Sequence, residues 1–145
     1  MNAILLLHAG STWGMVGLIW FVQLVHYPLL VYVGADRFVA YEREHCRRTS
    51  WVVGPLMLVE LATAAWLALD PPTGKAPVIA WLGVGLVAAL WLCTATVQVP
   101  LHNRLSQAYD ESAAARLART NWFRTAAWTA RGAIALYLLA DWSSR

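Results

Sequence analysis

The chain has 145 residues, of which 59% are hydrophobic and only 13% are charged, and its formal net charge is +3. Soluble domains average about 25% charged residues, so this composition excludes an ordinary water-soluble domain and favours a lipid environment. The positive charge does not indicate nucleic-acid binding, because the basic residues gather in the connections between apolar segments. Nine Trp residues agree with a membrane location, since indole favours the membrane–water interface.

Four apolar segments are long enough to cross a bilayer, which takes about 20 residues. In chain order they cover about residues 4–33, 51–69, 77–101 and 122–139. Pro28 should kink the first segment or loosen its last turns. The first segment has no evident small-residue cleavage site, so we expect it to be retained. The predicted fold is therefore all-α: one integral membrane domain, residues 1–145, that forms a four-helix bundle.

Two polar connections join these spans on one side of the membrane. Residues 34–49 carry ring-bearing side chains at helical spacing, which predicts a short interfacial amphipathic helix between the first two spans. The spacing is that of Phe38, Tyr41 and His45. In residues 103–121, an acidic pair precedes an Ala-rich run, which predicts a helix that starts near Glu111 and continues into the fourth span.

The distribution of Lys and Arg predicts the orientation. The connections and their edges carry Arg37, Arg43, Arg47, Arg48, Arg104, Arg116, Arg119 and Arg124. The opposite side carries only Lys75 and Arg145. Because basic loops stay in the cytoplasm, we expect both termini and the DPPTG turn at residues 70–74 to lie outside. For a bacterial protein, the membrane would be the inner one.

Polar residues inside spans are informative, because hydrocarbon penalises them. When the spans are folded together, one set falls in the cytoplasmic half of the bundle: Gln23, His26, Gln98, His102, Asn121 and Arg124. His45 lies at the same surface, and His8 lies at the outer end. Two pairs of these residues share a helix face, because their members are three or four positions apart: Gln23 with His26, and Gln98 with His102. We therefore predict that His26 and His102 face one cavity.

Glu60 and Arg131 form a second polar set. Each lies about 15 Å from the cytoplasmic surface, close to the bilayer centre. A lone buried charge costs several kcal/mol, and a partner of opposite charge offsets most of that cost. We therefore expect the two side chains to form a buried ion pair, which could act as a structural clamp or as part of a proton relay.

Two stretches resemble a known family. Residues 98–105 (QVPLHNRL) resemble the VPLxNRL segment that closes the third span of the DUF1772, or anthrone oxygenase-like, family of small four-span membrane proteins. Residues 121–125 (NWFRT) resemble the N-x-x-R-T segment that opens its fourth span, and residues 25–28 (VHYP) resemble the first-span end of a bacterial subgroup. The resemblance implies a site at Asn103, Arg104, Asn121 and Arg124. His102 replaces the Asn that often precedes Asn-Arg.

Some members of that family oxidise anthrones to anthraquinones with dioxygen and no organic cofactor. Such an oxygenase, a monooxygenase-type oxidoreductase, needs a base that works near neutral pH and donors for the developing oxyanion. His26 or His102 fits the first role. Asn103, Asn121 and Arg124 fit the second. The implied partner is a hydrophobic, anthrone- or quinol-like small molecule held within the lipid bilayer.

Two other classes remain open. Imidazoles from different helices can hold a transition metal or haem, and His26, His45 and His102 could supply the ligands. The sequence contains no HxxxH or HExxH pair, and Cys46 and Cys93 form no CxxC motif. The third class is a non-catalytic transporter or structural membrane protein. A transporter of this length would have to assemble as a homo-oligomer.

Overall fold

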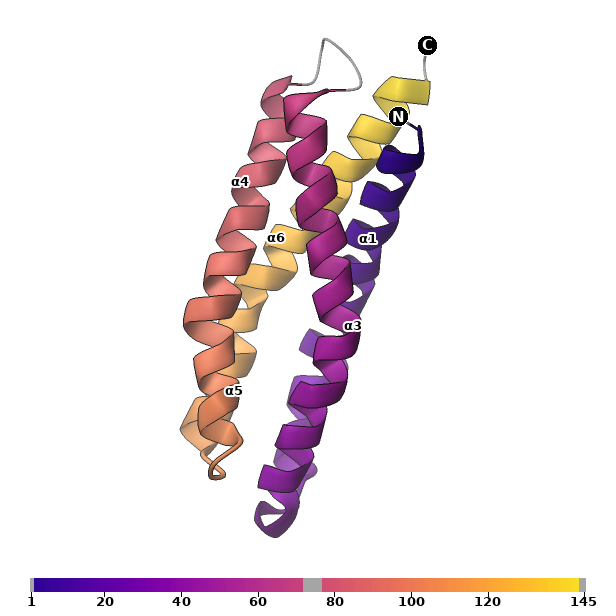
Figure 1. Ribbon diagram of the computed structural model, residues 1–145. Coiled ribbons are helices and arrows are strands. Elements are labelled where there is room, and N and C mark those ends of the chain that lie inside the picture. Colours follow the sequence, from indigo (N-terminus) through magenta and orange to yellow (C-terminus); the bar gives the residue numbers. More distant parts are fainter. Residues whose placement is uncertain (1, 72–76, 144–145) are drawn as a thin grey trace.

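The computed structural model describes residues 2–71 and 77–143, and these form an all-α bundle of four helical rods (Figure 1). The first rod joins α1 (Asn2–Phe21), η1 (Val22–His26), α2 (Tyr27–Leu29) and η2 (Leu30–Tyr32). The second is α3 (Ala35–Leu69). The third joins α4 (Pro77–Cys93), η3 (Thr94–Gln98) and α5 (Val99–Leu105), and the fourth is α6 (Glu111–Ser143). The all-α prediction is confirmed.

The first and third rods each widen into a π-helical turn just before a proline. Pro28 follows η1 and Pro100 follows η3. Proline lacks an N–H, and its ring collides with the carbonyl group four residues earlier, which belongs to Leu24 and to Thr96 respectively. The wider turn relieves that collision, and η2 then ends the first rod in a 3₁₀ turn. The expected disturbance at Pro28 therefore takes the form of changed helix type on both sides of the proline.

Residues 34–49 differ from the prediction in one respect. They are helical from Ala35, but they do not form a separate short helix, because α3 is one helix of 35 residues. Nothing between Cys46 and Trp51 breaks it, and the Ser50 hydroxyl donates to the Cys46 carbonyl at 2.8 Å within the helix. At 1.5 Å per residue α3 is about 52 Å long, which exceeds the roughly 30 Å hydrocarbon core of a bilayer. The helix is therefore longer than a membrane span requires, and its first turns can lie outside the hydrocarbon core.

The predicted start of the last helix near Glu111 is confirmed. Asp110 precedes α6, and its Oδ1 accepts hydrogen bonds from the Ser112 hydroxyl at 2.7 Å and the Ala113 N–H at 3.0 Å. These two donors, together with Arg104, hold the pKa of the Asp110 carboxyl below its usual value. A carboxylate in this position satisfies N–H groups that the first helical turn leaves free.

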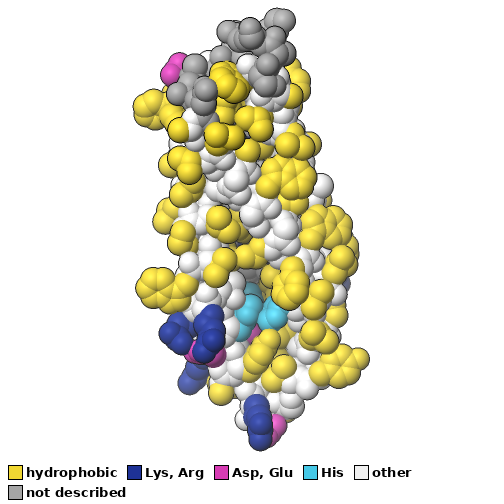
Figure 2. Space-filling model, turned by 90° about the vertical axis from the view of Figure 1, so that its right-hand side faces the viewer, with side chains coloured by type: hydrophobic (Ala, Val, Ile, Leu, Met, Phe, Trp, Pro, Cys, Tyr) yellow, Lys and Arg dark blue, Asp and Glu magenta, His cyan; other side chains and the backbone are white. Residues whose placement is uncertain are grey.

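The rods pack around three hydrophobic clusters spaced along the bundle. The beginning of α1 and the end of α6 lie at the same end of the bundle as the end of α3 and the beginning of α4 (Figure 1). The end that carries η2, the start of α3 and the α5–α6 connection is called the basic end below, since Arg residues gather there (Figure 2). The core near the basic end is built around Tyr27, Leu30, Phe38, Leu101, Leu105 and Leu117. The central core is built around Met15, Ile19, Met57, Leu90 and Trp128.

Three of the rods are long and apolar enough to cross a membrane: residues Ala3–Tyr32, Ala35–Leu69 and Pro77–Leu105. Large hydrophobic side chains cover the visible outer surface along its length (Figure 2), as a bilayer environment requires. The fourth rod, α6, is not among these three. Lys75, Arg145 and most of the predicted turn at residues 70–74 lie outside the described residues.

Candidate functional site

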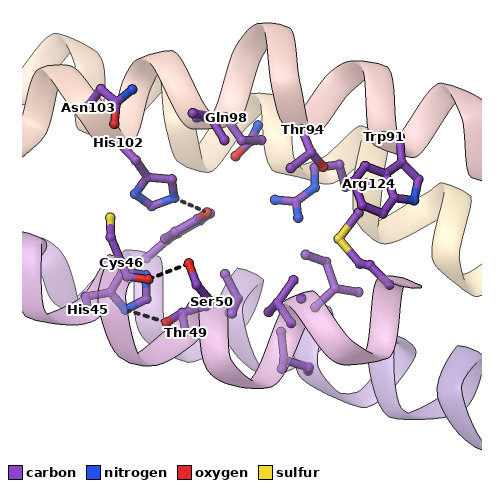
Figure 3. A pocket seen from close by; sticks show the side chains of 18 residues that line it. His45, Cys46, Thr49, Ser50, Trp91, Thr94, Gln98, His102, Asn103 and Arg124 are labelled. Carbon is purple, nitrogen blue, oxygen red and sulfur yellow. Dashed lines mark hydrogen bonds between the residues drawn. The ribbon is translucent and has the colours of Figure 1, made fainter. Parts of the chain in front are cut away.

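A cavity of about 360 Å³ lies between the rods in the half of the molecule nearer the basic end. This volume falls within the usual range for small-molecule sites. Its apolar walls include Leu18, Ile19, Val53, Met57 and Trp91. Its polar lining includes His45, Cys46, Gln98, His102, Asn103 and Arg124. Figure 3 shows His45, Cys46 and His102 at one end of the cavity, with Arg124 further along it.

His102 is held by a carboxylate that the sequence analysis did not single out. The Glu42 side chain is fully buried, and its Oε1 accepts a hydrogen bond from Nδ1 of His102 at 2.5 Å. With the proton on Nδ1, the other ring nitrogen, Nε2, is an acceptor for the Tyr27 hydroxyl, 3.4 Å away. A carboxylate behind an imidazole fixes its ring orientation and stabilises the imidazolium that forms when the ring takes up a proton. His102 therefore has the surroundings of a general base.

The other two predicted histidines lie beside it. The rings of His26 and His45 stack with centroids 4.1 Å apart and planes inclined by 18°. The His45 ring is 5.6 Å from that of His102, and its Nδ1 contacts the Thr49 hydroxyl at 3.2 Å. The cavity wall includes His102 but not His26, whose ring stacks on that of His45 and whose Nε2 is buried without a hydrogen-bond partner among the described residues. The structure thus brings together histidines from the first, second and third rods.

Arg124 and the neighbouring amides form a network from the first and fourth rods. Asn121 donates to Gln23 Oε1 at 3.0 Å and accepts from Arg124 Nη1 at 3.0 Å. The Arg124 guanidinium lies 5.0 Å from the ring of Trp128 and is only 7% exposed. Its Nε has no partner, and no ion pair joins it to a carboxylate among the residues that the structure describes. Arg124 is therefore a buried cation without a counter-charge on the wall of the cavity.

The remaining residues implied by the resemblance are placed differently. Asn103 lines the cavity at its exposed rim. Arg104 points away from it, with a side chain that is 64% exposed and forms an ion pair with Asp110. Gln98, which also lines the cavity, donates to the Thr120 hydroxyl at 3.0 Å. The structure therefore groups Asn121 and Arg124 with the cavity and leaves Arg104 at the surface.

Glu60 and Arg131 lie in the opposite half of the bundle. Arg131 Nε is 3.1 Å from Glu60 Oε1, and both side chains are almost completely buried. Glu60 also accepts from the Thr12 hydroxyl at 3.1 Å and from Trp128 Nε1 at 2.9 Å. Arg131 Nη2 donates to His8 Nε2 at 3.3 Å. These contacts satisfy both charges, which favours a structural clamp over a proton relay.

Three potential metal ligands lie close together, and two of them, Cys46 and His102, line the cavity. One ligand atom from each of Glu42, Cys46 and His102 lies within 4.8 Å of the others. This set shares only His102 with the predicted set of His26, His45 and His102, which stays a prediction. The spacing could have indicated Glu42, because it lies four residues after Phe38 and three before His45, on the same face of α3.

No family model, curated protein or solved structure matches the chain. The resemblance of residues 98–105 and 121–125 to the anthrone oxygenase-like family therefore stays a prediction.

Proposed function

We propose that the chain is an integral membrane oxygenase that acts, without a redox cofactor, on a flat hydrophobic molecule of the anthrone or hydroquinone type. One observation carries this proposal: His102, backed by the buried carboxylate of Glu42, and Arg124, whose guanidinium has no carboxylate partner among the described residues, line the same cavity. A base and a cation around an otherwise largely apolar space suit a substrate that becomes an anion during the reaction.

For an anthrone, the reaction begins with proton transfer from the acidic C–H of the substrate to His102. The electron pair left behind spreads onto the substrate oxygen, where the positive charge of Arg124 stabilises it. The carbanion then passes one electron to dioxygen, and the resulting radical and superoxide combine with a proton into a hydroperoxide. The carbon that carries the hydroperoxide group also carries a hydrogen, and loss of water from it leaves a carbonyl group. One anthrone and one O₂ thus give one anthraquinone and one H₂O. For a hydroquinone, the base would take an O–H proton instead, and O₂ would accept two electrons and two protons to give the quinone and H₂O₂.

The location of the cavity supports entry of the substrate from the bilayer. Histidine side chains are visible near the basic end, between helices covered with hydrophobic side chains (Figure 2). Trp51, Val52 and Val99 are exposed on α3 and α5, which together supply most of the polar end of the cavity. An apolar aromatic molecule partitions into lipid, so an opening at this depth would give it access without passage through water.

The proposal includes α6 as a fourth crossing. Two charges that lower the hydropathy of α6, Arg124 and Arg131, are 7% and 1% exposed, so lipid would not contact them. Arg116 and Arg119 are exposed, but they lie near the start of α6 at the basic end. With Arg residues kept in the cytoplasm, both chain termini would lie outside, and in a bacterium the membrane would be the inner one.

The test is oxygen consumption by the purified protein in nanodiscs, with anthrone and a panel of hydroquinones as substrates and a chelator present. We expect His102→Ala to lower turnover by about 10²–10⁴-fold, the usual contribution of a general base. Arg124→Gln should lower it by about 10²-fold, as for loss of one oxyanion donor. Arg47→Gln is the matched control, because Arg47 pairs with Glu44 on the surface.

Two results would contradict the proposal. One is the absence of substrate-dependent oxygen uptake by a folded, chelator-treated wild-type protein. The other is full turnover by the folded His102→Ala variant, because no other imidazole both lines the cavity and contacts a carboxylate among the described residues.

A further inference from the structure

Glu42 is a buried carboxylate with no arginine or lysine partner among the described residues. The four arginines nearest to it in the chain are engaged elsewhere: Arg37 lies 3.8 Å from the Asp36 carboxylate, Arg43 donates to the Ser106 carbonyl, and Arg47 and Arg48 bind Glu44. The remaining contacts of Glu42 are His102 and the Cys46 thiol, both on Oε1. Its Oε2 is buried, and it has no hydrogen-bond partner in the part of the chain that the structure describes. A buried carboxylate requires compensation by a proton or a cation.

We propose that Glu42, Cys46 and His102 form a binding site for a thiophilic divalent cation of the zinc type. Carboxylate, thiolate and imidazole together are the donor set that Zn²⁺ uses, whereas Mg²⁺ and Ca²⁺ take oxygen ligands. The second carboxylate oxygen of Glu42, Oε2, has no hydrogen-bond partner among the described residues, so it could also donate a lone pair to the ion.

Of the two distances from Glu42 Oε1 to the other ligand atoms, one already suits a bound zinc ion and the other requires a small movement of His102. In a tetrahedral site with usual Zn–S and Zn–O lengths, sulfur and oxygen lie about 3.6 Å apart, and Cys46 Sγ is 3.5 Å from Glu42 Oε1. The corresponding nitrogen–oxygen separation is about 3.3 Å, whereas His102 Nδ1 is 2.5 Å from Glu42 Oε1. The imidazole therefore has to move back by about 0.8 Å when the ion enters.

The three protein ligands leave a fourth position. Figure 3 shows His45 beside Cys46 at this end of the cavity, and its ring lies 5.6 Å from that of His102. The fourth position can therefore be taken by His45 or by a water molecule in the cavity. On binding, the Cys46 thiol loses its proton to solvent and the proton between His102 and Glu42 is displaced.

Metal binding and base catalysis exclude each other. The ion takes Nδ1 of His102, and the neutral ring then carries its proton on Nε2, which can no longer accept one from the substrate. This consequence rests on the proposed function. Zn²⁺ should then inhibit oxygen uptake by the wild-type protein. The same Zn²⁺ concentration should inhibit the Cys46→Ser variant less, because one metal ligand is missing. The binding itself is tested without turnover.

The binding test uses Co²⁺ as a spectroscopic probe for Zn²⁺ in the intact, nanodisc-embedded protein under anaerobic conditions. We expect one equivalent of Co²⁺ per chain, intense d–d bands typical of tetrahedral coordination and a near-ultraviolet thiolate-to-cobalt charge-transfer band, all displaced by Zn²⁺. Cys46→Ser should abolish the charge-transfer band, while Cys93→Ser, at the other cysteine, should retain it. Glu42→Gln should weaken Co²⁺ binding by at least about 100-fold, the upper end of the effect of losing an outer-shell contact.

The site would be overturned if wild-type protein retained no Co²⁺, or if the charge-transfer band survived in Cys46→Ser. Loss of the band in the folded Cys93→Ser variant would overturn it too. The two proposals fail separately: cobalt bands without oxygen uptake remove only the oxygenase, and oxygen uptake without cobalt bands removes only the metal site.

Discussion

The contact between Glu60 and Arg131 gives a quantitative test of how the bundle is held together. Arg131 Nε lies 3.1 Å from Glu60 Oε1, and the two side chains are 1% and 3% exposed. Two opposite charges about 4 Å apart attract by about 4 kcal/mol at an effective dielectric constant of 20. Removing one partner of such a pair leaves an uncompensated charge. We therefore expect Glu60→Gln and Arg131→Gln each to lower the free energy of unfolding by about 3–5 kcal/mol.

The double variant should be more stable than the sum of the two losses predicts, because neither charge is then left alone. We expect a coupling energy of about 1–3 kcal/mol in a double-mutant cycle. The assay is reversible unfolding in mixed micelles with increasing dodecyl sulfate, followed by circular dichroism. The exposed pair of Glu44 and Arg47 is the matched control and should show little coupling. Losses that add to within about 0.5 kcal/mol would refute the buried pair.

Three further predictions concern orientation, packing and pH. In whole cells of a bacterial host, an impermeant maleimide should leave Cys46 unlabelled and should label it in inverted vesicles; labelling of intact cells would reverse the orientation. Gly83→Ala should lower the free energy of unfolding by about 1–3 kcal/mol, because the added Cβ would lie 2.6 Å from Arg131 Nη1. Gly85→Ala is the control, because a Cβ there meets open space and should not destabilise the protein. Equal losses of stability in the two variants would contradict this packing. Asp110→Asn should destabilise the protein at neutral pH. The carboxyl has a lowered pKa in the folded state, so its contribution to stability is present above its unfolded pKa and lost as pH falls through the folded pKa. A stability difference between Asp110→Asn and the wild type that persists once the carboxyl is fully protonated would contradict the capping role.

The length and composition of the apolar segments were sufficient to predict that the chain is all-α. Long apolar runs can satisfy their backbone groups only as helices in lipid, so the all-α fold followed from composition and segment length. Local capping signals such as Asp110 also predicted where α6 begins. The continuity of α3 was not predictable in the same way. The sequence changes from polar to apolar near residue 50, which resembles a boundary between two helices, yet α3 continues through this point and through Pro55.

The candidate site depended on the tertiary structure. Depth along each span predicted that Gln23, Asn121 and Arg124 would lie together, and the structure joins them by hydrogen bonds. Depth does not specify how each helix is rotated, and a rotation of about 100° per residue decides whether a side chain faces a neighbour or lipid. Glu42 belonged in sequence to a charged segment typical of a solvated surface, yet the length and rotation of α3 bury it completely against His102. Segment length and composition thus determined the helices, whereas their rotation and packing decided which polar groups share one cavity.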